Sequence, residues 1–176
     1  MKYRRIFEDG YSYFLTLVTH ERKSLLVENI DLLRYAVKLS KKKYEYVLDA
    51  IVILPDHLHM IITPSIASDY PKIITHIKRS FVYGIDEHVK NKSKNNLTTA
   101  KYKRGHAGVW QERYYEHTIR DEKDFKIRLD YIHFNPVKHG YVNAAKEWEY
   151  SSFSKFVKLG EYNIDWCDFE DSTDFE

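Results

Sequence analysis

The chain has 176 residues, the length of one domain, and its 43% hydrophobic and 31% charged residues exclude a disordered or collagen-like protein. The single cysteine, Cys167, excludes a disulfide framework and any cysteine-based zinc or iron–sulfur site. The net charge of +2 is distributed unevenly, because residues 158–176 carry seven acidic groups and one lysine, whereas residues 1–157 carry 27 basic and 19 acidic groups.

The first part of the chain predicts a strand, a helix and a hairpin. β-Branched and aromatic residues from Tyr11 to Thr19 favour a strand. Apolar residues at helical spacing between Asn29 and Lys43 predict an amphipathic helix whose polar positions are rich in lysine. Segments 46–54 and 57–63 then read as the two strands of a hairpin, joined by a tight turn at Pro55-Asp56.

The second part predicts a helix, a strand and another helix. Apolar residues spaced by three and four positions indicate a helix from residue 69 to about residue 90. The aromatic segment 109–119 favours a fourth strand. Asp121 is a suitable N-cap for a last helix, and Pro136 and Gly140 mark where we expect that helix to end.

This order of elements predicts an α+β fold of the ferredoxin-like sandwich type. We expect an antiparallel sheet with the helices packed on one face, followed by a C-terminal extension. Residues 1–157 would form the domain and residues 158–176 an acidic tail. Three interpretations of the tail remain open: attraction to the basic surface of the domain, a solvated tail that aids solubility, or anchoring on the domain through Trp166 and Phe169.

The segment Asp56-His57-Leu58-His59-Met60 opens the second strand of the hairpin. Because side chains alternate along a strand, His57 and His59 share one face while Leu58 and Met60 point to the other, toward the core. Two neighbouring imidazoles form half of a divalent-metal site. The alternative is a pair of histidines with a purely structural role.

Tyr131 and Asn135 lie four residues apart on the last helix and therefore share a face. A phenol and an amide oxygen would then point into the same space, which suits a nucleophile beside a metal ligand. The alternative is a packed tyrosine and a helix-terminal asparagine that turns the chain before Pro136.

Four linked motifs in order make this chain, from Tyr11 to Ser152, resemble the single-tyrosine HUH transposases, specifically the branch of REP-associated tyrosine transposases. The motifs are Pro55-Asp56-His57-Leu58-His59; Trp110-Gln111 with Tyr114-Tyr115-Glu116-His117 and Ile119-Arg120; Tyr131-Ile132-His133 with Asn135-Pro136-Val137 and Gly140; and Tyr150-Ser151-Ser152.

The resemblance implies a role for each member of the two constellations. His57 and His59 would bind the metal, Tyr131 would be the nucleophile, and Asn135 would complete the metal site. The insertion-sequence branch usually has glutamine where this chain has Asn135, and the REP-associated branch accepts asparagine there. The adjacent tyrosines Tyr114 and Tyr115 are the competing choice of nucleophile, but they lack a pairing with an amide residue like that of Tyr131 with Asn135.

The implied activity is a metal-dependent DNA strand transfer, in which a transposase cleaves and rejoins single-stranded or hairpin DNA through a 5′-phosphotyrosine. A phenol with an ordinary pKa near 10 attacks phosphate poorly at neutral pH, so a cation is needed to withdraw charge. Uncharged imidazole and amide ligands predict weak binding of Mg²⁺ or Mn²⁺ until DNA arrives. Two alternatives are a metal-dependent phosphodiesterase that uses water and a non-catalytic regulator that binds DNA hairpins.

Basic residues interleaved with aromatic ones favour a nucleic-acid partner. Segment 72–104 carries nine basic residues against two acidic ones, and polar residues 92–106 are expected to form a mobile loop. The alternative is a solvated basic helix and loop. If the acidic tail is attracted to the basic surface that DNA needs, it would compete with DNA there. The candidate DNA contacts, including two positions that match the family pattern, are Lys78, Arg79, Lys101, Lys103, Arg104, His117 and Arg120.

No apolar run approaches the roughly 20 residues that a membrane span needs, and the N-terminus lacks the apolar stretch of a signal peptide. We therefore expect a cytoplasmic, nucleoid-associated protein with DNA as its partner and no membrane partner. Both a monomer and a homodimer are compatible with the sequence.

Overall fold

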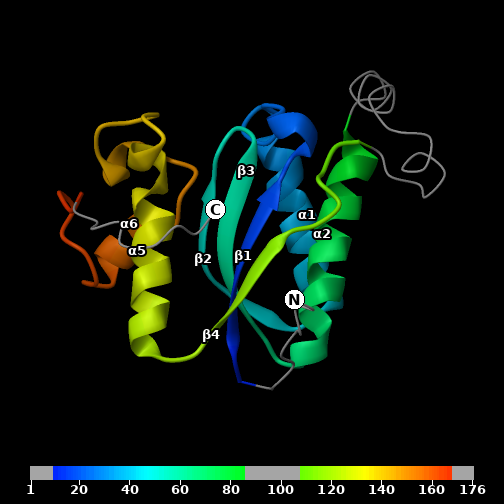
Figure 1. Cartoon of the computed structure of the whole chain (residues 1–176), viewed down its shortest axis with the longest axis horizontal. Coiled ribbons are helices and arrows are strands. Elements are labelled where there is room, and N and C mark those ends of the chain that lie inside the picture. Colours follow the sequence, from blue (N-terminus) through cyan, green and yellow to red (C-terminus); the bar gives the residue numbers. More distant parts are fainter. Residues whose placement is uncertain (1–9, 86–107, 168–176) are drawn as a thin grey trace, which may run out of the picture.

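Four antiparallel strands form the centre of the structure, in the order β2-β3-β1-β4 (Figure 1). They are β1 (Ser12–Val18), β2 (Tyr46–Ile53), β3 (His57–Pro64) and β4 (Tyr115–Ile119). The computed structural model describes residues 10–85 and 108–167. The predicted loop 92–106 lies outside these residues. The strand order and connectivity confirm the α+β, ferredoxin-like class.

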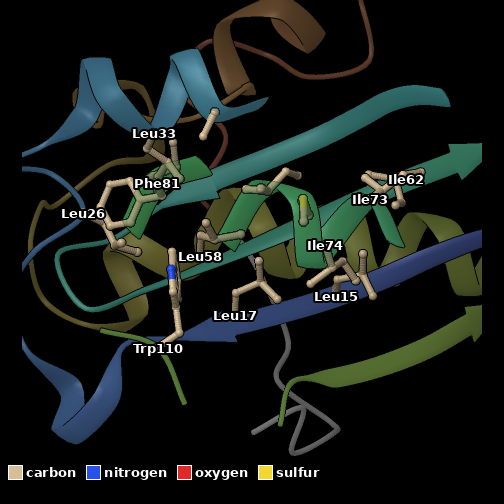
Figure 2. Packing of buried hydrophobic residues seen from close by; sticks show 14 of the residues in the cluster. Leu15, Leu17, Leu26, Leu33, Leu58, Ile62, Ile73, Ile74, Phe81 and Trp110 are labelled. Carbon is tan, nitrogen blue, oxygen red and sulfur yellow. The ribbon is translucent and has the colours of Figure 1, made fainter. Parts of the chain in front are cut away.

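Two helices cover one face of the sheet, α1 (Ile30–Lys43) and α2 (Tyr70–Gly84). Their apolar residues pack on inward-facing side chains of β1 and β3 to form a cluster that we name the α1/α2 core (Figure 2). Leu15, Leu17 and Leu58 belong to it, together with Phe81 of α2. The prediction of a helix to about residue 90 is confirmed up to Gly84, and residues 86–90 lie outside the described part.

A third long helix, α5 (Glu122–Lys138), lies on the opposite face of the sheet (Figure 1). Phe14 and Ile61 pack there against Leu129 and Ile132, forming the α5 core. The prediction that all helices lie on one face was therefore wrong for α5. The reason lies in β1, whose residues 13–17 are all buried, so this strand is covered on both sides of the sheet and contributes apolar side chains to both cores.

The ends of α5 show how local sequence sets its limits. The Asp121 carboxylate accepts a hydrogen bond from the backbone N–H of Asp124 (2.8 Å), which confirms the predicted N-cap. The prediction that Pro136 and Gly140 mark the end of the helix is confirmed, because α5 ends at Lys138, between them. Pro136 lies inside the last turn, where a proline removes only one helical hydrogen bond. The chain leaves the helix at Gly140, whose φ of +71° suits glycine.

The predicted strand 109–119 is only partly formed. Residues 115–119 pair with β1, but Trp110 makes a single bridge to Thr19, and the chain between them does not join the sheet. The backbone N–H of Gln111 donates to the carbonyl of Val18 (2.9 Å). The intervening segment therefore forms a wall beside the end of β1.

Short elements complete the described chain: the 3-10 helices His20–Arg22, Ala67–Asp69 and Ala145–Glu147, and α6 (Phe153–Lys158). After α6, the Trp166 ring packs against Tyr162, with ring centroids 4.7 Å apart, and both contact Phe153 of the α5 core. The described part of the predicted acidic tail is thus anchored through Trp166, whereas Phe169 lies outside the described residues. None of the described helices is long and apolar enough to cross a membrane.

Candidate functional site

His57 and His59 lie on β3, on the face that α5 covers. Their ring centroids are 5.0 Å apart, and both side chains are buried. Leu58 and Met60 between and after them belong to the α1/α2 core on the other face. The prediction that the two histidines share one face of the strand is confirmed.

Each imidazole is oriented by a hydrogen bond at Nδ1. His57 Nδ1 pairs with the Asp56 carboxylate (2.6 Å), and His59 Nδ1 pairs with the Thr16 hydroxyl of β1 (2.8 Å). If Nδ1 carries the proton in both rings, each Nε2 keeps its lone pair. Both Nε2 atoms are buried and have no hydrogen-bond partner among residues 10–85 and 108–167.

The electrostatics of the pair favour uncharged rings. Burial lowers the pKa of His57, although Asp56 opposes this effect, and burial together with the neighbouring His57 holds the pKa of His59 well below its ordinary value. Burial alone would raise the pKa of Asp56, but its hydrogen bond to His57 and the nearby Arg22 lower it overall. The site therefore holds an ionised carboxylate behind two neutral imidazoles, the form that binds metal.

Tyr131 and Asn135 lie one turn apart on α5 and are fully buried. The Tyr131 ring stands almost perpendicular to that of His59, with 5.2 Å between centroids. The side-chain oxygen and nitrogen of Asn135 have no hydrogen-bond partner within the described part of the chain. The fold thus brings Tyr131 of α5 against His59 of β3, although the two residues are 72 positions apart.

Two residues at the end of α5 join this site without having been predicted. The Lys138 ammonium lies 5.0 Å from the centroid of the Tyr131 ring, and the His139 ring lies 5.1 Å from that of His57. Helical spacing could have indicated them, since residues 131, 135, 138 and 139 are three, four, seven or eight positions apart or adjacent and so lie on one side of a helix. Thr16 offered no such signal, because only the pairing of β1 with β3 places it opposite His59.

The residues present suit a small, hard cation only in part. No three His, Cys, Asp or Glu side chains cluster as a metal site among the described residues. Two buried imidazole nitrogens and the amide oxygen of Asn135 nevertheless lack partners within residues 10–85 and 108–167, and unsatisfied buried polar atoms of this kind need an explanation. An arrangement of two imidazoles and one amide would leave several coordination positions for water and phosphate oxygens.

A pocket of about 370 Å³ opens beside the two histidines. Its wall comes from β1, the 3-10 helix His20–Arg22, β3, the start of β4 and the segment before β4, and no residue of α5 lines it. The lining residues are Thr16, Val18, Arg22, His57, His59, Gln111, Arg113, Tyr114 and Tyr115. We refer to this cavity as the Gln111 pocket.

The predicted DNA contacts on α2 differ in their surroundings. Lys78 donates a hydrogen bond to the backbone carbonyl of Gln111 (2.7 Å) and lies over the Trp110 ring, and burial lowers its pKa to about 8. Arg79 is exposed and lines a separate groove between α1 and α2. Lys78 therefore supports the wall of the Gln111 pocket, and a contact of either residue with DNA stays a prediction.

Two further candidates lie near the start of α5. His117 Nε2 pairs with Asp124 (2.7 Å), and the backbone N–H of Arg120 donates to the same carboxylate (3.2 Å). Although burial would raise it, the pKa of Asp124 is lowered by the hydrogen bond from His117 and by the other donors around it. DNA contacts of His117 and Arg120 stay predictions. The remaining candidates lie outside the described residues: Lys101, Lys103 and Arg104.

Comparisons with known proteins agree on one family. The family model described as "Transposase IS200 like" matches residues 8–135. A REP-associated tyrosine transposase of Escherichia coli is 34% identical over 176 residues, which cover 99% of this chain and 94% of that protein. A protein of Haemophilus influenzae given the same family description is 42% identical over 166 residues, covering 93% of this chain and 92% of that protein.

A solved structure is similar over nearly the whole chain. It is described as a REP-associated tyrosine transposase bound to a REP hairpin, and its TM-score is 0.78 at 33% sequence identity. The match covers 99% of this chain and 94% of the other. The similarity therefore includes the sheet, the covering helices and the elements after α5.

Proposed function

The chain belongs to the IS200-like transposase family, in its branch of REP-associated tyrosine transposases, and from this membership we propose that Tyr131 cleaves and rejoins single-stranded or hairpin DNA. The observation that carries the proposal is the contact of the Tyr131 ring with His59, beside two imidazole nitrogens that lack a hydrogen-bond partner in the described part of the chain. The contact of a phenol on one element with an imidazole pair on another supports the proposal, because phosphoryl transfer to a tyrosine needs a nucleophile beside a cation site.

The proposed reaction exchanges one phosphate ester for another. The Tyr131 hydroxyl oxygen bonds to the phosphorus, the bond from phosphorus to the 3′ oxygen breaks, and the phenolic proton is balanced by the proton that the 3′ oxygen gains. The products are a 5′-phosphotyrosine and a 3′-hydroxyl end. Because the phosphate ester is conserved, the reverse reaction rejoins DNA without a nucleotide cofactor.

We infer that His57 and His59, through Nε2, and Asn135, through Oδ1, would hold a Mg²⁺ or Mn²⁺ ion. When bound, the cation would withdraw charge from the scissile phosphate. The Asp56 carboxylate and the Thr16 hydroxyl hold the two rings through their Nδ1 atoms, so that each Nε2 would be available to the cation. Because the three ligands contribute no negative charge, binding should be weak until DNA supplies phosphate oxygens.

The proposed substrate is a DNA hairpin with an unpaired flank. The similar solved structure holds a REP hairpin, and the body of this chain carries eight more basic than acidic groups. Inverted repeats that flank the gene are the natural source of test hairpins. A protein with this substrate would be found with the nucleoid.

Labelled hairpin DNA incubated with the protein and Mn²⁺ or Mg²⁺, followed by denaturing electrophoresis, tests the proposal. A covalent protein–DNA adduct that matches a new 3′ end is the expected result. DNA fragments without an adduct would instead indicate attack by water, that is, a phosphodiesterase. Tight binding with no cleavage under either cation would indicate a hairpin-binding regulator.

A further inference from the structure

The Gln111 pocket has the size and the chemistry of a site for one nucleotide base. Its volume of about 370 Å³ lies at the lower end of the range for small-molecule sites. Gln111 and Arg113 are exposed at its wall. Each carries a planar group that can form two hydrogen bonds to the edge of one base. Tyr114 and Tyr115 add aromatic surface on which a base can stack.

The wall that carries these groups is held in place before any ligand binds. The backbone of Gln111 donates to Val18 (2.9 Å) and accepts from Lys78 (2.7 Å). One residue earlier, Trp110 bridges Thr19 and packs on Phe81 of the α1/α2 core. Since the backbone makes these contacts, the Gln111 side chain contributes to none of them, and it remains available at the pocket surface.

The position of the pocket relative to Tyr131 indicates which base it would hold. The His59 ring contacts Tyr131 of α5 and also lines the pocket, whereas no α5 residue does so. His59 thus adjoins both the proposed nucleophile and the cavity. In phosphoryl transfer, the attacking and leaving oxygens lie roughly in line on opposite sides of phosphorus. Attack from α5 therefore directs the leaving 3′ oxygen toward the pocket.

We propose that the Gln111 pocket binds the unpaired base of the nucleotide whose 3′ oxygen is displaced, with Gln111 and Arg113 contacting its edge. This inference rests on the proposed function, because it uses Tyr131 as the attacking group. It makes Gln111 and Arg113 residues that determine the preferred base immediately 5′ of the cut.

Abasic nucleotides test the proposal. The cut is located by sequencing the new 3′ end, and hairpins are then made with an abasic nucleotide at each position of the unpaired flank. Single-turnover cleavage rates and dissociation constants are measured for the wild type and for the double variant Gln111→Ala, Arg113→Ala. Arg34→Ala is the charge-matched control, because Arg34 is an exposed residue of α1 that lies outside both the site and the pocket.

The expected result is a coupling between one base and two side chains. The abasic nucleotide immediately 5′ of the cut should slow wild-type cleavage at least tenfold, and the double variant should slow cleavage of the intact hairpin by a similar factor. Cleavage of the abasic hairpin by the double variant should be less than threefold slower than with either change alone, because both changes remove the same contact. Arg34→Ala should respond to the abasic nucleotide as the wild type does.

Two results would overturn the inference. One is independent, multiplicative effects of the abasic nucleotide and the double variant. The other is coupling of the double variant to the nucleotide on the 3′ side of the cut. If the wild type formed no adduct with intact hairpins, the proposed function would fail instead, and dissociation constants across the abasic series would still show whether any base couples to Gln111 and Arg113.

Discussion

The ammonium of Lys138 lies 5.0 Å from the centroid of the Tyr131 ring, two helical turns further along α5. Tyr131 is buried, whereas Lys138 is exposed, so a positive charge stands at the solvent side of the phenol. Phosphoryl transfer to Tyr131 would place a negatively charged phosphate next to this ring. We therefore expect the Lys138 charge to stabilise the phosphate that reacts with Tyr131, and this role can be tested together with that of the tyrosine.

Tyr131→Phe should abolish the covalent adduct while leaving the fold and hairpin binding within about twofold, because only the phenolic oxygen is lost. Adduct formation is read on denaturing gels and binding by fluorescence anisotropy. Tyr115→Phe is the matched comparison, since Tyr115 is exposed on β4 and lines the Gln111 pocket. An adduct that persists in Tyr131→Phe and disappears in Tyr115→Phe would contradict the assignment of the nucleophile.

His57→Ala and His59→Ala should each lower Mn²⁺-dependent cleavage by at least a hundredfold, because each removes one of the two imidazole nitrogens proposed to bind the cation. Asp56→Asn should lower it by roughly 10- to 100-fold, since the carboxylate only orients His57. Calorimetric titration should show tighter Mn²⁺ binding with hairpin present than with protein alone. Equal affinities in the two titrations would argue against phosphate oxygens as ligands.

Lys138→Met should slow single-turnover cleavage at least tenfold with little change in the dissociation constant of the hairpin, because the charge acts near the reacting phosphate. Lys138→Arg should recover part of the rate. The control is Lys126→Met. Lys126 is on the same helix as Lys138 but lies away from the site, with its ammonium 4.3 Å from the centroid of the Tyr162 ring. Equal rates in Lys138→Met and the wild type would show that this charge does not act on the reaction.

Lys78 should make the stability of the fold depend on pH in the alkaline range. Its pKa of about 8 in the folded chain lies below the ordinary 10.5, so the unfolded chain binds more protons between these two values. Folding stability should therefore rise with pH across this window, by about 2 kcal/mol at pH 9.5 relative to Lys78→Met. Urea unfolding of both proteins from pH 7 to pH 9.5 measures the difference, and parallel curves would contradict the burial of the ammonium.

Removal of residues 168–176 should tighten hairpin binding at low salt. These residues hold five of the seven acidic groups of the tail, and under the hypothesis of electrostatic competition they would compete with DNA for the basic body of the domain. The truncation is placed after Cys167 because Tyr162 and Trp166 pack on the α5 core. The gain in affinity should shrink as the salt concentration increases, since salt screens the attraction between the acidic tail and the basic surface. Affinities that match at low salt, in a truncated protein with an unchanged melting temperature, would exclude competition.

Local patterns in the sequence predicted the strand face of the two histidines, the start of α5 and the spacing of two site residues on that helix. The alternation in Asp56-His57-Leu58-His59 placed both imidazoles on one face, and Asp121 marked the start of α5. The spacing of Tyr131 and Asn135 placed them one turn apart on that helix. These features depend on the period of a strand or a helix and on the hydrogen bonds of one helix end, so a few neighbouring residues contain the whole signal.

Only the tertiary structure decided which faces meet. Because β1 has apolar side chains on both sides, nothing in its pattern says that α5 packs opposite α1 and α2. That packing is what brings Tyr131 to His59. The same holds for Thr16, which orients His59 through strand pairing, and for the segment 110–114, which leaves the sheet to line the Gln111 pocket. These relationships join residues far apart in the chain, and the hydrophobic effect that drives them is non-directional, so a local pattern does not encode the partner.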